Sequence, residues 1–349
     1  MHQPATPTPI ENLDYREGIG AAHNLRPPIA RSPSPMLPHL NFADSNINFL
    51  GHRRVAVAIS VVLVLVSLIL LATRGLDYGI DFTGGTLVEV GYPEAVDLDP
   101  IRRQLADAGF ERPTVQYFGK SRDVLIRLPP QEEDPMQAVL SSEVLSALTA
   151  GGPPGLELRR VEFVGPAVGE ELREQGGLAM IYALFGILIY VAVRFEWRFA
   201  VGAVLALAHD VIVTLGFFAL TGLEFDLAVL AAILAVIGYS LNDTIVVYDR
   251  IRENFRLLRK ESTEFVMNDA VNKTLSRTIL TSLTTLLVLV SLLVLGGAAL
   301  KTFAIAMIVG VVVGTHSSIF IAAAAALMLG VDRKVLLPVK REGVDEDTP

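Results

Sequence analysis

Asp243 is the clearest candidate for a functional residue in this sequence, because it is a charged residue inside a long stretch of apolar residues. A carboxylate in such a membrane span costs about 2.5 to 3.5 kcal/mol on insertion scales, so it is usually there for a function. Ser240 and Thr244 lie beside it at helical spacing from each other, and Asn242 adds an amide. This polar patch predicts that Asp243 faces protein rather than lipid.

Arg277 is the cation that could meet Asp243, because it begins the next apolar stretch. At the rise of an α-helix, Asp243 lies about 7 Å before the end of its own helix, and Arg277 starts the following helix at comparable depth. The positions four, seven and eight residues after Arg277 are Thr281, Thr284 and Thr285. They predict a polar stripe that can hold water or form hydrogen bonds between helices.

Asp243 and Arg277 together suggest a proton relay, in which the carboxyl group is alternately protonated and paired with the guanidinium. Burial favours the neutral carboxyl group and a nearby cation favours the carboxylate, so these opposing effects make the charge switchable. Two structural interpretations remain open. The pair can form a fixed salt bridge between helices, or the Arg277 side chain can extend to the membrane surface.

Asp210 is a second carboxylate in the middle of an apolar stretch, and it follows His209. It is either a second member of the relay or a buried hydrogen-bond partner that positions a neighbouring helix. His316 is a candidate proton shuttle, although a packed neutral histidine is the favoured interpretation. The histidines have no metal-ligand spacing, so we expect no metal or other cofactor, with protons as the coupling ion.

The composition excludes several classes of protein. Hydrophobic residues make up 52% of the 349 residues, and charged residues make up 19%, against about 25% in soluble domains. The net charge of −8 argues against binding to nucleic acid. Because the chain has no cysteine, it has no disulfides, thiolate zinc sites or cysteine nucleophiles. No GxxxxGK[ST] motif is present, so we expect no nucleotide-hydrolysing P-loop and no enzyme of this class.

The elements that must position these residues are six stretches, each with at most one charged residue. Each is long enough to approach or cross a hydrocarbon core of about 30 Å. They lie at 55–73, 177–193, 199–221, 227–248, 278–297 and 302–330. We therefore predict a polytopic α-helical membrane protein with six transmembrane helices.

Lysine and arginine residues indicate which ends of these helices face the cytoplasm. They gather before the first stretch, between the second and third, in the predicted cytoplasmic loop at 249–276, and in the tail at 331–349. This asymmetry predicts that both termini are cytoplasmic. The 249–276 loop is expected to be either an amphipathic helix on the membrane face or a solvated connector. The Pro-rich residues 1–45 predict a disordered cytoplasmic leader without a cleavable signal peptide.

The segment 75–170 must then lie outside the membrane, in the periplasm or its equivalent. Its apolar patterning predicts a small ferredoxin-like domain with the element order βαββαβ. The expected strands lie at 86–92, 114–118, 124–128 and 156–164, and the expected helices at 99–110 and 135–148. Gly79, Gly84 and Gly85 join the first span to this domain, where they can serve as a hinge or as a strand bulge.

Three groups of motifs resemble the SecF family of bacterial protein-export subunits. They are the sequences at 79–86, just after the first span, at 161–169, before the second span, and at 238–243 with 249–254, at the end of the fourth. The resemblance covers roughly residues 45–330. It implies half of a 12-helix bundle of the RND superfamily, located in the cytoplasmic (inner) membrane.

The resemblance also implies a set of partners and a mechanism. The partners are a second six-span subunit, SecD, with the SecYEG channel, YajC and YidC, and indirectly the ATPase SecA. The cargo is an unfolded exported polypeptide, pulled outward with energy from the proton gradient. The relay positions of the family fall on Asp243 and Arg277, and a further relay carboxylate belongs to SecD. His316 stands where an aromatic residue such as tyrosine is commoner in the family.

Two other functions compete with protein export. An RND-like proton-coupled exporter of small molecules or lipids would use the same charged pair, but its outer region is usually much larger than the domain found here. A non-transporting assembly subunit of the translocon would have no need of Asp243. A neutral variant at this position therefore separates the assembly role from both transport functions.

Overall fold

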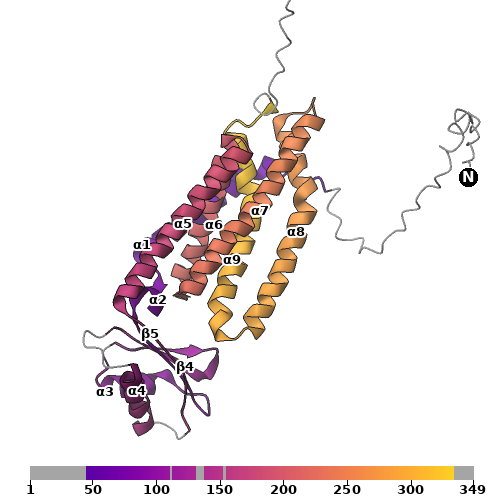
Figure 1. Cartoon of the computed structure of the whole chain (residues 1–349). Helices are drawn as coiled ribbons and strands as arrows, with labels where there is room; N and C mark the ends of the chain where they lie inside the picture. The colour runs from indigo at the N-terminus through magenta and orange to yellow at the C-terminus, as the bar shows by residue number, and fades with distance from the viewer. Residues whose placement is uncertain (1–44, 111, 131–136, 152–154, 334–349) are drawn as a thin grey trace, which may run out of the picture. The chain divides into compact units, whose positions relative to one another are not determined.

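Figure 1 shows the computed structural model, which describes residues 45–110, 112–130, 137–151 and 155–333. The predicted leader up to residue 44 and the predicted tail from residue 334 lie outside the described residues. Within these ranges, six helices are long and apolar enough to cross a membrane. This confirms the predicted number of spans.

Five of the spans are single helices and the sixth is divided. The single helices are α1 (Arg53–Thr73), α5 (Pro166–Arg194), α6 (Trp197–Thr221), α7 (Leu227–Leu257) and α8 (Thr263–Leu295). The sixth span consists of α9 (Lys301–Ser317), a π-helical turn η4 (Ser318–Ala322) and α10 (Ala323–Met328). Short 3-10 turns, η2 (Leu50–His52) and η3 (Ala298–Leu300), precede α1 and α9.

The helices α7 and α8 are longer than the apolar stretches that predict them. With 31 and 33 residues they extend for about 45 to 50 Å, well beyond a hydrocarbon core of about 30 Å. Only residues 258–262 separate them, so most of the segment 249–276 is helix that continues the two spans. Ser262 ends the turn by accepting a hydrogen bond from the backbone nitrogen of Phe265, which caps α8.

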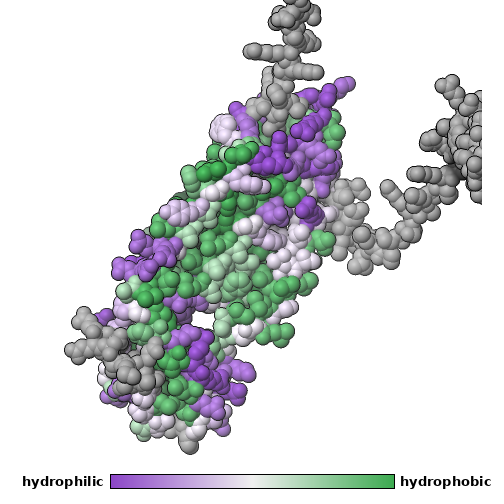
Figure 2. All heavy atoms as spheres, viewed as in Figure 1, coloured by the Kyte–Doolittle hydropathy of each residue, from purple (hydrophilic) through white to green (hydrophobic). Residues whose placement is uncertain are grey.

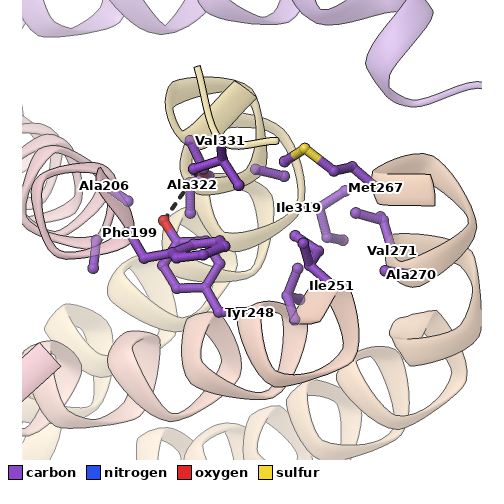
Figure 3. Close-up of a cluster of buried hydrophobic side chains, with 14 of the residues drawn as sticks. Phe199, Ala206, Tyr248, Ile251, Met267, Ala270, Val271, Ile319, Ala322 and Val331 are labelled. Carbon is purple, nitrogen blue, oxygen red and sulfur yellow. Dashed lines mark hydrogen bonds between the residues drawn. The ribbon is translucent and has the colours of Figure 1, made fainter. Parts of the chain in front are cut away.

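The outer surface of the helical part is apolar, as a bilayer requires. Hydrophobic residues cover the sides of α5 and α8 in Figure 2, and large apolar side chains of α1 are exposed as well. Inside, Phe199 of α6 packs against Tyr248 of α7 with ring centroids 4.6 Å apart, and the Tyr248 hydroxyl donates to the carbonyl oxygen of Ala322 (Figure 3). Tyr248 therefore ties α7 to the π-helical turn.

The segment between α1 and α5 folds as an α+β domain. Its elements are β2 (Gly85–Gly91), α3 (Leu98–Asp107), β3 (Thr114–Phe118), β4 (Lys120–Leu128), α4 (Gln137–Gly151) and β5 (Glu157–Val164). The strands pair antiparallel in the order β3-β4-β2-β5, which confirms the predicted ferredoxin-like βαββαβ arrangement. Residues 135 and 136 of the second predicted helix lie outside the described residues. Alternate strand residues such as Val88, Val90 and Ile126 form the core with Leu105 and Leu148.

The glycine motif after α1 packs against the start of α5. Gly84 and Gly85 have φ angles of +72° and +120°, in the region that favours glycine. A Cβ atom on Gly84 would lie 2.8 Å from the Cα atom of Pro166, and one on Gly85 would overlap the carbonyl oxygen of Leu128. These two glycines are therefore required for close packing, whereas a hinge at Gly79, Gly84 and Gly85 stays a prediction.

A second junction joins the α+β part to the loop between α6 and α7. The short strand β1 (Asp77–Tyr78) pairs in parallel with β6 (Glu224–Phe225). Arg127 of β4 forms an ion pair of 2.7 Å with Glu224, and the Asp81 carboxylate accepts a hydrogen bond from the backbone nitrogen of Leu227. Polar contacts thus hold the sheet to the loop that leads into α7.

Candidate functional site

Asp243 lies in the interior of the bundle, where three spans meet. Its side chain is buried on α7 and accepts two hydrogen bonds from hydroxyl groups. Thr278 Oγ1 of α8 donates at 2.6 Å to Oδ1, and Ser318 Oγ of the π-helical turn donates at 2.7 Å to Oδ2. The prediction that Asp243 faces protein is confirmed, and both carboxylate oxygens are occupied by short hydrogen bonds.

Asp210 forms a second buried site on α6. Ser240 Oγ of α7 donates to its Oδ2 atom at 2.6 Å, and Ser317 Oγ of α9 donates to the same atom at 2.7 Å. The Oδ1 atom lies 3.0 Å from Nδ1 of His209. Asp210 therefore does position neighbouring helices, as one of the two sequence interpretations expected. Its membership of a relay stays a prediction.

The two carboxylate sites are joined by consecutive residues. Ser317 is the last residue of α9 and binds Asp210, whereas Ser318 is the first residue of the π-helical turn and binds Asp243. The π-helix is rare and is found mostly as single turns inside α-helices, frequently at functional sites. Here the irregular turn allows one span to supply a hydroxyl to a carboxylate on each of two neighbouring spans.

The predicted cation, Arg277, lies outside this site. Arg277 is exposed on α8, and it makes no ion pair within the part of the chain that the structure describes. The neighbouring Thr278 occupies the position beside Asp243 instead. Asn242 and Thr281, two of the predicted supporting residues, are exposed as well.

The other supporting residues differ in their roles. Ser240 is buried and binds Asp210 rather than Asp243. Thr244 is buried, and its Oγ1 atom has no hydrogen-bond partner among the described residues. His316 stacks on Phe320 with ring centroids 4.9 Å apart, as expected for a packed histidine.

Sequence reasoning missed Thr278, Ser317 and Ser318. On α8 the buried polar stripe is formed by Thr274, Thr278 and Ser282, which repeat every four residues. The polar stripe predicted from the sequence was counted from Arg277, one residue before Thr278, and therefore follows a neighbouring line of positions along α8. The signal was present in the sequence, because Thr278 and Ser282 fit the same helical spacing as Thr281 and Thr285.

Acidic residues also gather where the α+β domain meets the loop before α7. Burial raises the pKa of the Glu224 carboxyl group above its ordinary range, and the Arg127 guanidinium offsets part of that effect. Burial likewise raises the pKa of Asp226, which caps α7 by accepting a hydrogen bond from the backbone nitrogen of Val229. Among the described residues, no cluster of three or more His, Cys, Asp or Glu side chains is arranged to hold a metal ion.

Comparison with known proteins identifies related sequences over most of the chain. The family model for "Protein export membrane protein SecD/SecF, C-terminal" matches residues 144–332, and the "SecD/SecF GG Motif" matches residues 69–92. A protein translocase subunit SecF from Vibrio alginolyticus is 48% identical, over 87% of this chain and 97% of its own length. The SecF of Pseudomonas aeruginosa is also 48% identical, over 89% of this chain and 100% of its own length.

Two solved structures share the fold. The crystal structure of SecDF, a translocon-associated membrane protein from Thermus thermophilus, is 40% identical over 82% of this chain, with a TM-score of 0.73. A SecDF structure in a super-membrane-facing form is 40% identical over the same share, with a TM-score of 0.62. The chain spans about two fifths of each of these structures, since it covers 39% of their length.

Proposed function

Since the chain belongs to the SecF family of protein translocase subunits, we propose that it promotes protein export across the cytoplasmic membrane by using the proton gradient. The observation that carries the proposal is the pair of buried carboxylates, Asp210 and Asp243, held by hydroxyl groups of three spans and joined through Ser317 and Ser318. Carboxylates inside apolar spans cost free energy to bury, and such residues usually mark a functional site.

Asp243 is the group whose charge changes in this proposal. Hydroxyl donors from Thr278 and Ser318 hold the carboxylate in the interior of the bundle. Protonation would remove the charge that orders the two hydroxyl groups and so loosen the contact of α7 with α8 and η4. One proton that crosses a potential of 100 mV supplies about 2.3 kcal/mol, enough to bias a movement with a gap of a few kcal/mol.

Beside Asp243 and Thr278, the outward sides of α7 and α8 carry exposed polar residues, which supports the presence of a partner protein in the membrane. Asn242 and Arg277 each precede one of the two residues in the Asp243–Thr278 hydrogen bond, and both are exposed. Polar groups on a span are satisfied by neighbouring protein, and small residues allow helices to approach closely. The exposed positions of this face include Ala231, Ala235, Gly238, Asn242, Arg277 and Thr281. We propose that this face binds SecD and that a carboxylate of SecD can face Arg277.

The remaining partners follow the role of the family. The complex would act beside the SecYEG channel, with YajC and YidC as further partners, and after SecA has driven the polypeptide into the channel. The Arg53 end of α1, the Arg194 end of α5 and the Trp197 end of α6 carry basic residues, which supports a cytoplasmic location of that end of the bundle. The α+β domain would then lie in the periplasm. The proposed activity needs no cofactor and no enzymatic step of this chain.

The test is export of a preprotein into vesicles that contain this chain together with SecD and SecYEG, with and without a proton gradient. Asp243→Asn should abolish the stimulation by the gradient and leave export driven by SecA and ATP unchanged. Asp249→Asn is the matched control, because it removes the same charge from the same helix at an exposed surface ion pair with Arg194. Full stimulation in the Asp243 variant would favour the assembly role instead.

A further inference from the structure

Three hydroxyl groups form a chain of hydrogen bonds close to the Asp243 site. The Tyr239 hydroxyl of α7 donates at 3.2 Å to Oγ of Ser282 on α8, and Ser282 Oγ lies 2.7 Å from Oγ1 of Thr315 on α9. Thr315 uses its own hydrogen to donate at 2.7 Å to the carbonyl oxygen of Val311. Because a hydroxyl group has only one hydrogen, Ser282 donates to Thr315 and Tyr239 donates to Ser282. All three hydroxyl groups therefore have a fixed orientation.

This hydroxyl layer, formed by Tyr239, Ser282 and Thr315, joins the same three spans as the Asp243 site. Each member lies about one helical turn, or about 4.5 to 6 Å, from a member of that site, on the side of the α+β domain. The pairs are Tyr239 with Asp243 on α7, Ser282 with Thr278 on α8, and Thr315 with Ser318 on the sixth span. A neutral layer of polar contacts is thus stacked on the charged one.

The hydroxyl layer also contacts the Asp243 site directly. Ser318 Oγ, which donates to Asp243 at 2.7 Å, lies 3.1 Å from the carbonyl oxygen of Thr315. Ser318 is the first residue of the π-helical turn, so the last turn of α9 determines where its hydroxyl group lies. Thr315 therefore fixes that turn through its side chain and contacts Ser318 through its backbone.

The helix α8 has few other contacts that could fix its rotation inside the membrane. Of its residues from 278 to 295, only Thr278, Ser282 and Leu289 are buried. Thr278 and Ser282 lie one turn apart on the same line, and each forms a hydrogen bond to a neighbouring span. The bond from Tyr239 to Ser282 therefore helps to set the rotation that brings Thr278, rather than Arg277, to Asp243.

We propose that Tyr239 is a positioning residue for the relay and that it acts through Ser282 and Thr315. The hydroxyl layer holds α8 and α9 in the orientation at which both helices supply donors to Asp243. Hydroxyl groups in a chain polarise one another, so loss of the first donor weakens the bonds that follow it. The inference rests on the proposed function, because it names the residues that keep the relay aligned.

Tyr239→Phe tests the proposal, because it keeps the ring and removes only the first donor. In vesicles with SecD and SecYEG, stimulation of export by the gradient should fall about threefold or more, with export driven by SecA and ATP unchanged. Tyr182→Phe is the matched control, since Tyr182 is 67% exposed on α5 and makes no hydrogen bond among the described residues. Thr315→Val should reduce the stimulation and Thr315→Ser should retain it, because only serine keeps the hydroxyl group. Full stimulation in both Tyr239→Phe and Thr315→Val would overturn the proposal.

A double-mutant cycle separates positioning from a general loss of stability. If Tyr239 acts through the hydroxyl group of Ser318, its removal should matter less once that hydroxyl group is absent. The loss of stimulation in the variant with both Tyr239→Phe and Ser318→Ala should then be clearly smaller than the product of the two single losses. Losses that multiply would show that the two residues act independently, which contradicts the positioning role.

Infrared difference spectra of the same complex test the positioning without measuring export. The band of the Asp243 side chain, identified by its absence in Asp243→Asn, has a frequency that depends on the hydrogen bonds it accepts. This band should shift in Tyr239→Phe and stay in place in Tyr182→Phe. If Asp243→Asn loses stimulation and the band does not shift, the relay holds and the positioning role fails. If Asp243→Asn keeps full stimulation and the band shifts, the positioning holds and the proposed function fails.

Discussion

At the scale of single residues, the relay depends on hydroxyl groups as much as on carboxylates. Ser318 and Thr278 provide the two hydrogen bonds that Asp243 receives from side chains, and Ser317 with Ser240 plays the same part at Asp210. Hydroxyl groups suit this position because they donate to a carboxylate and can turn to accept from a carboxylic acid. The site can therefore hold either charge state, with hydrogen bonds that are weaker when the carboxyl group is neutral.

Replacing Ser318 by alanine should weaken the relay without unfolding the bundle. The variant removes one hydrogen bond to a charged group, worth about 1.5 to 3 kcal/mol, so we expect gradient-driven export to fall about tenfold or more. Ser318→Thr keeps the hydroxyl group and should restore most of the rate. The control is Ser291→Ala on the exposed side of α8, where the hydroxyl donates a hydrogen bond to the backbone carbonyl oxygen of Leu287. Equal rates for the Ser318 and Ser291 alanine variants would contradict the assignment.

Replacing Gly85 by alanine should destabilise the α+β domain. The φ angle of +120° strains an alanine by about 1 to 3 kcal/mol, and its Cβ atom would overlap the carbonyl oxygen of Leu128. We expect a lower melting temperature of the purified protein in detergent. Gly177→Ala, in open space on α5, should leave it unchanged or slightly raised. A similar loss in both variants would mean that Gly85 has no special steric role.

Among the residue-scale predictions, the position of Asp243 in the interior of the protein is confirmed. An ionised group in lipid costs free energy, so Asp243 is expected to lie inside the bundle, and its place in an apolar stretch can be read directly from the sequence. The partner of Asp243 depends on the rotation of α8 about its own axis. Packing sets that rotation, because Arg277 and Thr278 both lie in a stripe of the correct period.

At the scale of elements, the contacts between β1, β6 and β4 form a junction that should respond to pH. Burial raises the pKa of Glu224 above its ordinary value of 4.5, so the folded protein binds this proton more tightly than the unfolded chain. The stability that Glu224 contributes is then fully present below about pH 4.5 and is lost as the pH rises through its raised pKa. The side of the membrane proposed for this junction is the side from which protons enter.

Glu224→Gln should reduce this pH dependence. The amide keeps the shape of the side chain and does not ionise, so the melting temperature should change less between about pH 4 and about pH 8 than in the unaltered protein. Asp99→Asn, whose side chain is 70% exposed on α3, should keep the original pH dependence. An unchanged profile in the Glu224 variant would remove this carboxyl group from the junction's response.

The elements themselves could be predicted well wherever one period continues over a whole segment. The six spans and the βαββαβ order follow from long apolar runs and from alternation. The π-helical turn at Ser318–Ala322 could not be predicted, because its residues fit an α-helix equally well by composition. The charged extensions of α7 and α8 were missed because the search for spans stops at charged residues, whereas a helix does not.

At the scale of the whole molecule, the α+β domain also contacts the loop between α8 and α9. A Cβ atom on Gly119, at the turn between β3 and β4, would lie 3.6 Å from the Cβ atom of Ala298. This separation is within the range of about 3.5 to 4.5 Å that a disulfide spans. Cysteines at these two positions could therefore form a disulfide that links the sheet to the membrane bundle. The natural chain has no cysteine that would compete with them.

Gly119→Cys combined with Ala298→Cys should block the stimulation of export under oxidising conditions, if the domain moves during each cycle. A reductant should restore the stimulation. Each single cysteine variant, treated with the same oxidant, serves as the control for strain at Gly119, where φ is +81°. Full stimulation with the disulfide formed would show that export needs no movement between these two parts.

The residues before α1 are held by two asparagine side chains of α8, which lies much later in the sequence. Asn272 of α8 accepts from the backbone nitrogen of Ile47 and donates to its carbonyl oxygen, both at 2.9 Å, and Asn268 binds Ile47 and Leu50. The partners are 218 to 225 positions apart, so this clasp cannot close until the ribosome has synthesised α8. The first span is thus synthesised before its anchor exists, and the segment 47–50 is fixed only after α8 has been made.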